Sequence, residues 1–330
     1  MERILEVLTI CLPVFALIGL GIVLRRSGRM NDDHQQFLTW FINTLCLPAL
    51  IFVNVASEDF ARLINLPVIS ATLGATLIAA LIGLTVARAG RLAPAFAGPA
   101  IFGGYWANVT YLGFPLAQSA YGSLGLTIGS VVNAFTMPVF VASGIIVCHL
   151  LRHDADLGWY RILRRVFTNP IILAALLGIV VALIGLWSPV QGALALGDDG
   201  SVPMIRQLIG ILAASLRLLG GPGLALALVA IGYGLRWRTV RDHRGLLAFT
   251  VIAKTLVTPL VTLLILSLLF PGIPAADRGV AVMMMATPCA VACYVIGSQE
   301  GADGPFLAAH LTLSTAVSCL SIPVWLYWVL

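Results

Sequence analysis

Apolar segments about 20 residues long, the length that carries a helix across roughly 30 Å of hydrocarbon, follow one another along almost the whole chain. By this criterion the sequence predicts ten membrane-spanning segments, at residues 4–24, 36–56, 66–88, 98–121, 124–150, 169–187, 208–235, 246–270, 278–299 and 304–330. Backbone groups in lipid must bond within their own segment or in a closed barrel, and no alternation with a period of two runs through these segments. The expected fold class is therefore an all-α polytopic membrane protein.

The composition supports one membrane domain. Of the 330 residues, 60% are hydrophobic and only 10% are charged, which is too little charge for the surface of a soluble domain of this size. The net charge of +5 could indicate nucleic acid, but the basic residues gather in short clusters between apolar segments, as membrane topology signals do. The lipid bilayer is therefore the expected partner, and nucleic acid is not.

The cysteines do not indicate a metal or a disulfide framework. All six lie in apolar segments without the paired spacing of a zinc site: Cys11, Cys46, Cys148, Cys289, Cys293 and Cys319. Small buried hydrophobes are the better interpretation, so no metal ligand and no cofactor are predicted.

The arginines predict the orientation in the membrane. Alternate connections carry thirteen arginines, beginning with Arg25 and Arg26, whereas the opposite connections carry four. Because cytoplasmic loops are enriched in basic residues, both termini are expected on the non-cytoplasmic side, which an even number of spans allows. The first apolar segment precedes Arg25, the reverse of the charge order in a signal peptide, so it is expected to be a retained span.

Matching motifs in the two halves predict an inverted repeat. The first span reads PVFALIGLGIV from Pro13, and the sixth reads PIILAALLGIV from Pro170. Prolines of the second and fourth spans are 67 residues apart, and those of the seventh and ninth are 66 apart. Five spans per half is an odd number, so the second copy would enter the membrane from the opposite face. The expected units are a first repeat at 1–151, a cytoplasmic linker at 152–168 and a second repeat at 169–330.

The fourth predicted span contains an unusual stretch, NVTYLGFPLAQSAYG, from Asn108 to Gly122. Proline and glycine make it a poor continuous helix. The ninth span mirrors it with Thr287, Pro288 and Tyr294. Ordinary proline kinks would explain either span alone. As a pair at matching positions they indicate a transporter binding site, where freed amides and the positive ends of half-helices attract an anion.

The same stretches resemble the auxin efflux carrier family, whose members include plant PIN proteins and bacterial malonate-type carriers. Similar segments continue along the chain as LPALIF, RRVFTNPIILAALLGIVVALIG, PGLALALVAIGYGL and ATPCAVACYVIGSQEGAD. Plant members are expected to carry a second proline where this chain has Cys293, which leaves the position of the ninth span's break open.

The resemblance implies ten helices in two inverted five-helix repeats. Spans four and nine would break and cross near the membrane centre, an organic anion would bind beside the crossing, and transport would be of the elevator type. It also implies a bacterial inner (plasma) membrane location. Asn108, Gly113 and Pro115 match the fourth-span motif, and Asn133 would face the site. The expected substrate site is Asn108, Gly113, Pro115, Gln118, Asn133, Thr287, Pro288, Cys293 and Tyr294.

Two polar residues within the spans are candidates for ion coupling. Lys254 lies about nine residues inside the eighth span, roughly 13 Å from its end, where a charge is a functional hypothesis. It could attract the anion or couple to protons, or it could extend toward the cytoplasmic headgroups. His310 in the tenth span is a second coupling candidate, although a packing role is the more common one. No Asp or Glu lies in the middle of a span.

A secondary carrier for a mono- or dicarboxylate is the leading functional hypothesis. A sodium-coupled symporter of the bile-acid type is the alternative, followed by a channel. The chain has no GxxxxGK[ST] motif for ATP-driven transport. An intramembrane enzyme is not expected, because no Gly-x-Ser-x-Gly or His-Glu-x-x-His motif is present. A homodimer stays open as the assembly.

Overall fold

The computed structural model describes residues 2–57, 65–152, 160, 163–164, 167–183, 204–235 and 243–330. This part of the chain is helical, and its only β feature is one isolated bridge between Ala107 and Cys289. Seven of its helices are long and apolar enough to cross a membrane, against the ten spans predicted: Ile4–Arg26, Asp32–Ala56, Leu66–Ala89, Val109–Leu151, Gly210–Gly234, Arg244–Leu269 and Gly304–Val329.

The remaining predicted spans correspond to shorter pieces. The fourth is divided between α6 and the start of the next helix, the ninth is divided into α15 and α16, and the sixth is represented by α9. The fourth and fifth run together in α7, where the backbone turns at Gly122 with φ +59°. Most of the predicted linker 152–168 lies outside the described residues.

The helices, with three π-helical turns named η, have the following bounds: α1 Glu2–Arg26, α2 Asp32–Phe41, η1 Ile42–Cys46, α3 Leu47–Ala56, α5 Leu66–Ala89, α6 Pro94–Phe102, η2 Val109–Gly113, α7 Phe114–Arg152, α9 Pro170–Leu183, α11 Met204–Gly220, α12 Gly223–Gly234, α13 Arg244–Ile252, η3 Ala253–Val257, α14 Thr258–Leu269, α15 Ala275–Ala286, α16 Val291–Gln299 and α17 Gly304–Val329.

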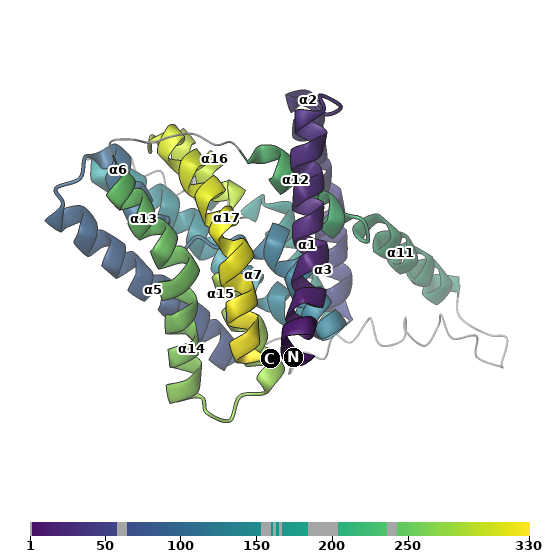
Figure 1. Ribbon diagram of the computed structural model, residues 1–330. Coiled ribbons are helices and arrows are strands. Elements are labelled where there is room, and N and C mark those ends of the chain that lie inside the picture. Colours follow the sequence, from purple (N-terminus) through teal and green to yellow (C-terminus); the bar gives the residue numbers. More distant parts are fainter. Residues whose placement is uncertain are drawn as a thin grey trace.

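The helices pack as two groups. The first helix group contains α1, α2, α3, α9, α11 and α12, in which α1 packs on α12 and α3 packs on α9. The second helix group contains α5, α6, α7 and α13 to α17, in which α15 contacts α7, α14 and α17. Figure 1 shows α1, α3, α11 and α12 on one side and α5, α6, α13 and α14 on the other. Contacts of α1 with α17 and of α3 with α7 join the groups.

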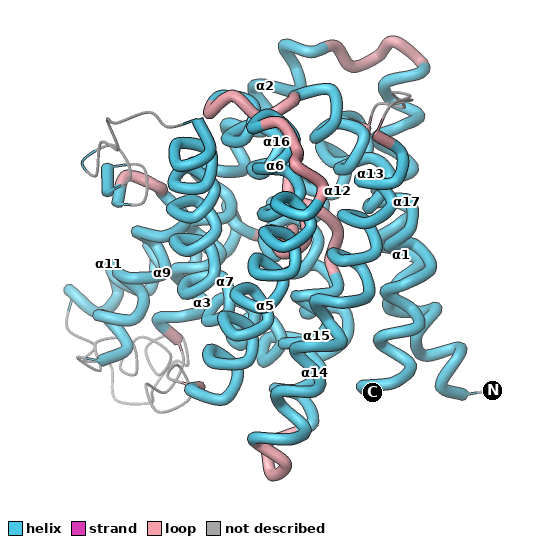
Figure 2. The backbone as a smooth tube through the Cα atoms, turned by 90° about the vertical axis from the view of Figure 1, so that its left-hand side faces the viewer, coloured by secondary structure: helices cyan, strands magenta, loops and turns pink. Residues whose placement is uncertain are grey.

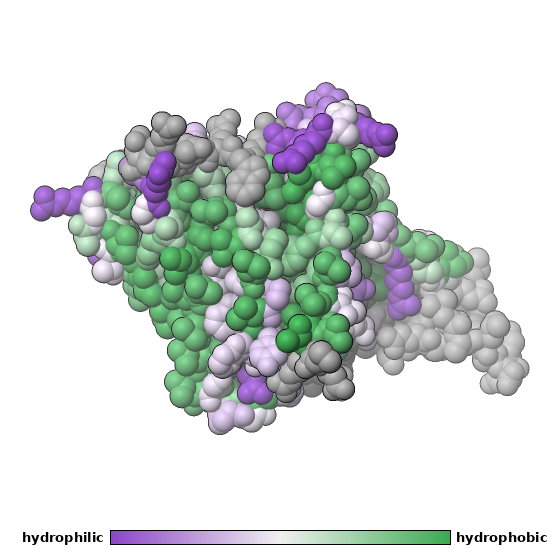
Figure 3. Space-filling view, in the orientation of Figure 1, coloured by the Kyte–Doolittle hydropathy of each residue, from purple (hydrophilic) through white to green (hydrophobic). Residues whose placement is uncertain are grey.

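The outer surface suits a lipid environment. Large apolar side chains are exposed along the outside of several helices, for example Leu12, Leu81, Leu177 and Leu268. Figure 3 shows hydrophobic residues over most of one face, with hydrophilic residues gathered along its upper edge. A soluble protein rarely exposes so large an apolar surface, so the chain is an integral membrane protein.

Each π-helical turn is followed by a proline. The turns η1, η2 and η3 end two residues before Pro48, Pro115 and Pro259, respectively. Proline has no amide hydrogen and its ring clashes with the carbonyl four residues earlier. A widened turn accommodates that carbonyl while the helix continues. Pro115 therefore lies in a continuous helical segment, and the break in the chain lies before it.

Helices α1 and α12 approach so closely that only glycine fits between them. A Cβ atom on Gly21 would lie 2.8 Å from the amide nitrogen of Tyr233 and 2.9 Å from the Cα atom of Gly232. Small residues allow this kind of backbone contact between membrane helices. The glycine pair therefore fixes the distance between α1 and α12.

We predict that Gly21→Ala lowers the thermal unfolding temperature of the detergent-purified protein, because overpacking costs about 1–3 kcal/mol. Gly19→Ala is the matched control, since a Cβ there meets no atom within 4 Å and alanine favours a helix by about 1 kcal/mol. Equal unfolding temperatures for the two variants would contradict the close contact.

Candidate substrate site

Two helices are interrupted inside the second helix group, and their interruptions cross. Helix α6 ends at Phe102 and helical structure resumes at Val109, whereas α15 ends at Ala286 and α16 begins at Val291. The amide of Asn108 donates to the carbonyl of Pro288 over 2.9 Å, and the amide of Ala290 donates to the carbonyl of Trp106 over 3.1 Å. These bonds form the antiparallel bridge, and Figure 2 shows the loop segments inside the helical body.

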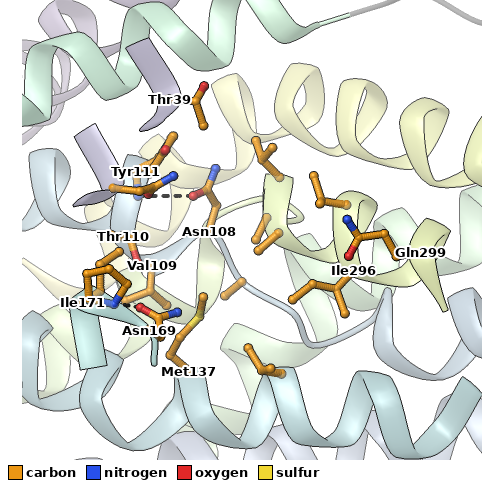
Figure 4. Close-up of a pocket in the computed structure, with 18 residues that line it drawn as sticks. Thr39, Asn108, Val109, Thr110, Tyr111, Met137, Asn169, Ile171, Ile296 and Gln299 are labelled. Atoms are coloured by element: carbon orange, nitrogen blue, oxygen red, sulfur yellow. Dashed lines mark hydrogen bonds between the residues drawn. The ribbon is translucent and has the colours of Figure 1, made fainter. Parts of the chain in front are cut away.

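A cavity of about 400 Å³ lies beside this crossing (Figure 4). Both crossing segments line it, together with α16, the middle of α7, the α2–η1 helix and the start of α9. It therefore lies between the two helix groups. The lining residues are Thr39, Asn43, Ala107, Asn108, Val109, Thr110, Tyr111, Met137, Val141, Asn169, Pro170, Ile171, Ala290, Val291, Ala292, Val295, Ile296 and Gln299.

Four backbone amides at the cavity have no acceptor among the described residues. They belong to Val109 and Thr110 at the start of η2, and to Val291 and Ala292 at the start of α16. The first amides of a helix have no partner within the helix and carry partial positive charge. None of the lining residues has a charged side chain. The positive character of this cavity therefore comes from the backbone.

Asn108 adds a side-chain donor to the same wall. It caps η2, because its Oδ1 accepts the amide of Tyr111 over 3.3 Å, while its buried Nδ2 has no partner among the residues that the structure describes. Figure 4 shows this bond and the Asn108 amide group at the cavity. Buried polar groups in native proteins are almost always hydrogen-bonded, so the arrangement leaves a donor for a bound acceptor.

Asn133 of α7 has the same hydrogen-bonding pattern as Asn108. Its Oδ1 accepts the Thr110 hydroxyl over 3.0 Å, and its Nδ2 is buried without a partner. It does not line the cavity itself, but Met137, one turn further along α7, does. The structure thus brings Asn108 and Asn133 together around Thr110.

Other predicted site residues of the fourth span lie away from the cavity. Gly113 packs against the sulfur of Met284, where a Cβ would not fit. Pro115 is buried inside α7, and Gln118 is exposed. None of the three predicted residues is among the lining residues.

Predicted residues of the ninth span shape the crossing rather than the cavity wall. Thr287 is buried and its hydroxyl donates to Met284 O over 2.7 Å, and Pro288 supplies the carbonyl that holds Asn108. Cys293 is fully buried. Tyr294 lines a second cavity of about 450 Å³, which shares Val291 and Val295 of α16 with the first.

Sequence reasoning missed several polar residues of the cavity. Thr39 and Asn43 lie within the predicted second span, and Asn169 is the first residue of the predicted sixth. Gln299 extends toward the cavity from α16 (Figure 4). A polar residue in an otherwise apolar span was the available signal, but one sequence does not say which side such a residue faces.

The two coupling candidates are buried away from the cavity. Lys254 is fully buried and its Nζ donates to Met285 O over 2.6 Å, so it does not extend to the headgroups. His310 is also fully buried, with Nε2 donating to Gly103 O over 3.0 Å and Nδ1 3.2 Å from the Thr250 hydroxyl. Within the described part of the chain, no group of three or more His, Cys, Asp or Glu residues could hold a metal ion.

The chain is similar to known membrane transport proteins over almost its whole length. A family model described as "Membrane transport protein" matches residues 6–152 and 160–326. An "Uncharacterized transporter" of Methanothermobacter thermautotrophicus is 25% identical over 323 residues, covering 95% of each chain. A "Putative malonate transporter" of Rhizobium meliloti is 26% identical over 330 residues, covering 98% of this chain and 95% of the relative.

The family match covers both halves of the chain and the two crossing segments described above. The protein therefore belongs to the membrane transport protein family, the auxin efflux carrier family.

Proposed function

We propose that this membrane transporter is a secondary carrier for a small organic anion. The observation that carries the proposal is the set of unpaired donors at the crossing: the amides of Val109, Thr110, Val291 and Ala292 and the Nδ2 of Asn108. Helix N-termini bind anions through such amides. A carrier must also release its substrate, and neutral donors bind a carboxylate without a buried ion pair.

A mono- or dicarboxylate is the proposed substrate class. The cavity holds about 400 Å³ and combines the amide donors with apolar walls from Met137, Val141, Val295 and Ile296. A short carbon chain with a terminal carboxylate suits that lining. The relative named for malonate supports the same class.

An inverted repeat of ten spans, with units 1–151 and 169–330, is the proposed architecture. Helix packing supports it. Gly21 of the first predicted span packs on α12, and Gly178, its match in the sixth, packs on Val55 of α3. Span one therefore packs on span seven in the same way that span six packs on span two. The crossing pairs spans four and nine with each other, as such symmetry requires.

Elevator-type movement is the proposed mechanism. Both crossing segments join helices of the second helix group, and the four unpaired amides lie in α16 and in η2, which continues directly into α7. Thr39 of α2 and Asn169 before α9 complete the cavity from the first helix group. Sliding of the second group along the first would carry the anion with its donors. The cavity lining includes Gln299 at the end of α16, which lies on the proposed cytoplasmic side.

The first test is exchange of radiolabelled malonate in proteoliposomes. A carrier gives saturable uptake that unlabelled malonate inside the vesicles accelerates, because the loaded protein returns faster. Flux that rises linearly with malonate and ignores internal substrate would instead indicate a channel. Uptake that requires sodium would favour the bile-acid-type symporter. If neither malonate nor a panel of mono- and dicarboxylates moves, the organic-anion proposal fails.

The second test replaces the unpaired donor of Asn108. Asn108→Asp keeps the oxygen that caps η2 but puts a carboxylate where the anion would bind. We expect malonate to lose its stabilising effect on thermal unfolding, because losing a hydrogen bond to a charged group weakens binding by roughly 10- to 100-fold. Asn108→Ala should lose it as well.

Asn65→Asp is the matched control for Asn108→Asp. Asn65 caps α5 in the same way, with Oδ1 accepting the Val68 amide over 3.2 Å, and it does not line the cavity. The control variant should respond to malonate like the wild type. Full stabilisation of Asn108→Asp by malonate would remove Asn108 from the site.

The proposed orientation places both termini on the non-cytoplasmic side of a bacterial inner membrane. Alkaline phosphatase fused after Leu330 should then be active in Escherichia coli, and green fluorescent protein at the same position should be dark, since each folds on one side only. A fluorescent green fluorescent protein fusion together with an inactive phosphatase fusion would reverse the orientation and place the Gln299 end of the cavity toward the outside of the cell.

A further inference from the structure

One bent helix holds the carbonyl ends of both interrupted helices. Lys254 of η3 donates from Nζ to Met285 O, in the last turn of α15, over 2.6 Å. Thr258, the first residue of α14, donates from Oγ1 to Gly104 O, two residues after the end of α6, over 2.6 Å. Both side chains are fully buried.

A third side chain reaches the same place from α17. Nε2 of His310 donates to Gly103 O over 3.0 Å, so two successive carbonyls after α6 are bonded by side chains. Lys254, Thr258 and His310 are called the carbonyl clamp below. None of them lines either cavity.

The partners of the clamp explain its chemistry. The last carbonyls of a helix have no partner within the helix and carry partial negative charge. A buried ammonium is costly unless it is paired. The carbonyl end of α15 supplies such a partner for Lys254, and the ammonium in turn satisfies a carbonyl that the interruption exposes. The cost of burying the ammonium and the cost of leaving the carbonyl without a hydrogen bond therefore offset each other.

The widened turn η3 explains how one helix reaches both ends. Pro259 has no amide hydrogen, so the carbonyl of Thr255 is free of its usual partner, and Trp325 donates to it from Nε1 over 2.9 Å. The Thr258 hydroxyl also contacts the Ala253 carbonyl, five residues earlier, at 2.9 Å. Side-chain donors thus stabilise the bend around Lys254 and Thr258.

We propose that Lys254 and Thr258 are positioning residues for the anion site. Their hydrogen bonds to the carbonyl ends of α15 and α6 hold the two crossing segments in position. The crossing segments lead directly into η2 and α16, so their position determines where the free amides of these two helices lie. Lys254 then acts as a countercharge that stays bonded to the carbonyl end of α15 and does not touch the substrate. The inference rests on the proposed function for its transport readout only.

The test compares two threonines one turn apart on the same helix. Thr258→Val removes the hydroxyl that bonds Gly104 O. Thr262→Val is the matched control, because Thr262 is equally buried but bonds only Thr258 O of its own helix. A third variant, Lys254→Met, removes the donor to Met285 O at similar side-chain length.

A thiol readout needs no substrate. Cys289 is fully buried in the crossing, and Cys46, fully buried in the first helix group, is an internal reference. We expect N-ethylmaleimide to alkylate Cys289 about tenfold faster, relative to Cys46, in Thr258→Val, since loosening by 1.4 kcal/mol raises an open population tenfold. Lys254→Met is tested by its KM for malonate instead, because Lys254 lies near Cys289 and its removal changes the reactivity of that thiol directly. Thr262→Val should match the wild type. Peptide mass spectrometry measures both rates.

The transport readout separates positioning from general damage. In malonate exchange, Thr258→Val should raise KM about tenfold while the maximal rate and the unfolding temperature stay close to those of Thr262→Val. If Lys254→Met does not fold, the comparison of Thr258→Val with Thr262→Val tests the carbonyl clamp by itself. Thr258→Val indistinguishable from Thr262→Val in thiol reactivity and in KM would overturn the clamp.

The two proposals can fail separately. Faster Cys289 alkylation in Thr258→Val together with no malonate transport by the wild type supports the clamp and removes the malonate proposal. The opposite result is also possible to distinguish. If the wild type exchanges malonate normally but Thr258→Val changes neither the alkylation of Cys289 nor KM, the carrier proposal stands and the clamp proposal fails.

Discussion

Backbone amides and carbonyls released by a broken helix cannot be left to hydrocarbon, and the central architecture follows from that constraint. At the crossing, Asn108 and Ala290 donate amides to carbonyls of the opposite segment. The bonds satisfy part of what the two interruptions release. The remaining carbonyls and amides have different surroundings. The carbonyls contact the buried side chains of η3, α14 and α17, whereas the residues that carry the free amides line the cavity.

In the proposed carrier, this arrangement lets a cavity whose lining has no charged side chain attract an anion. Helix N-termini supply the positive potential, and Asn108 supplies a directional donor whose other atom already caps η2. The fully buried Lys254 does not lie at these N-termini, because it bonds the carbonyl end of α15. Anion binding in the proposed carrier thus depends on where the backbone groups are placed. Packing residues outside the cavity lining therefore influence the affinity for the anion.

The all-helical membrane fold and the two interrupted helices could be predicted from the sequence, because apolar segments and polar residues within them leave strong patterns. The polar stretch from Asn108, which contains Pro115 and two glycines, indicated a site, and Asn108 does line the cavity. The position of the first interruption could not be predicted from Pro115, since a π-helical turn absorbs that proline. Nor does sequence reveal the partner of Lys254, because its acceptor is a backbone carbonyl 31 residues away. Tyr294 shows a further limit: it faces a second cavity, because neighbouring positions of a helix point in different directions.

The most direct measurement of the central claim is the position of a bound carboxylate in the protein. Bromomalonate in crystals of the protein would mark it by the anomalous signal of bromine. We expect a bromine peak inside the cavity, with carboxylate density against the amides of Val109, Thr110, Val291 and Ala292. A peak confined to the second cavity beside Tyr294, or to any site away from the crossing, would contradict it.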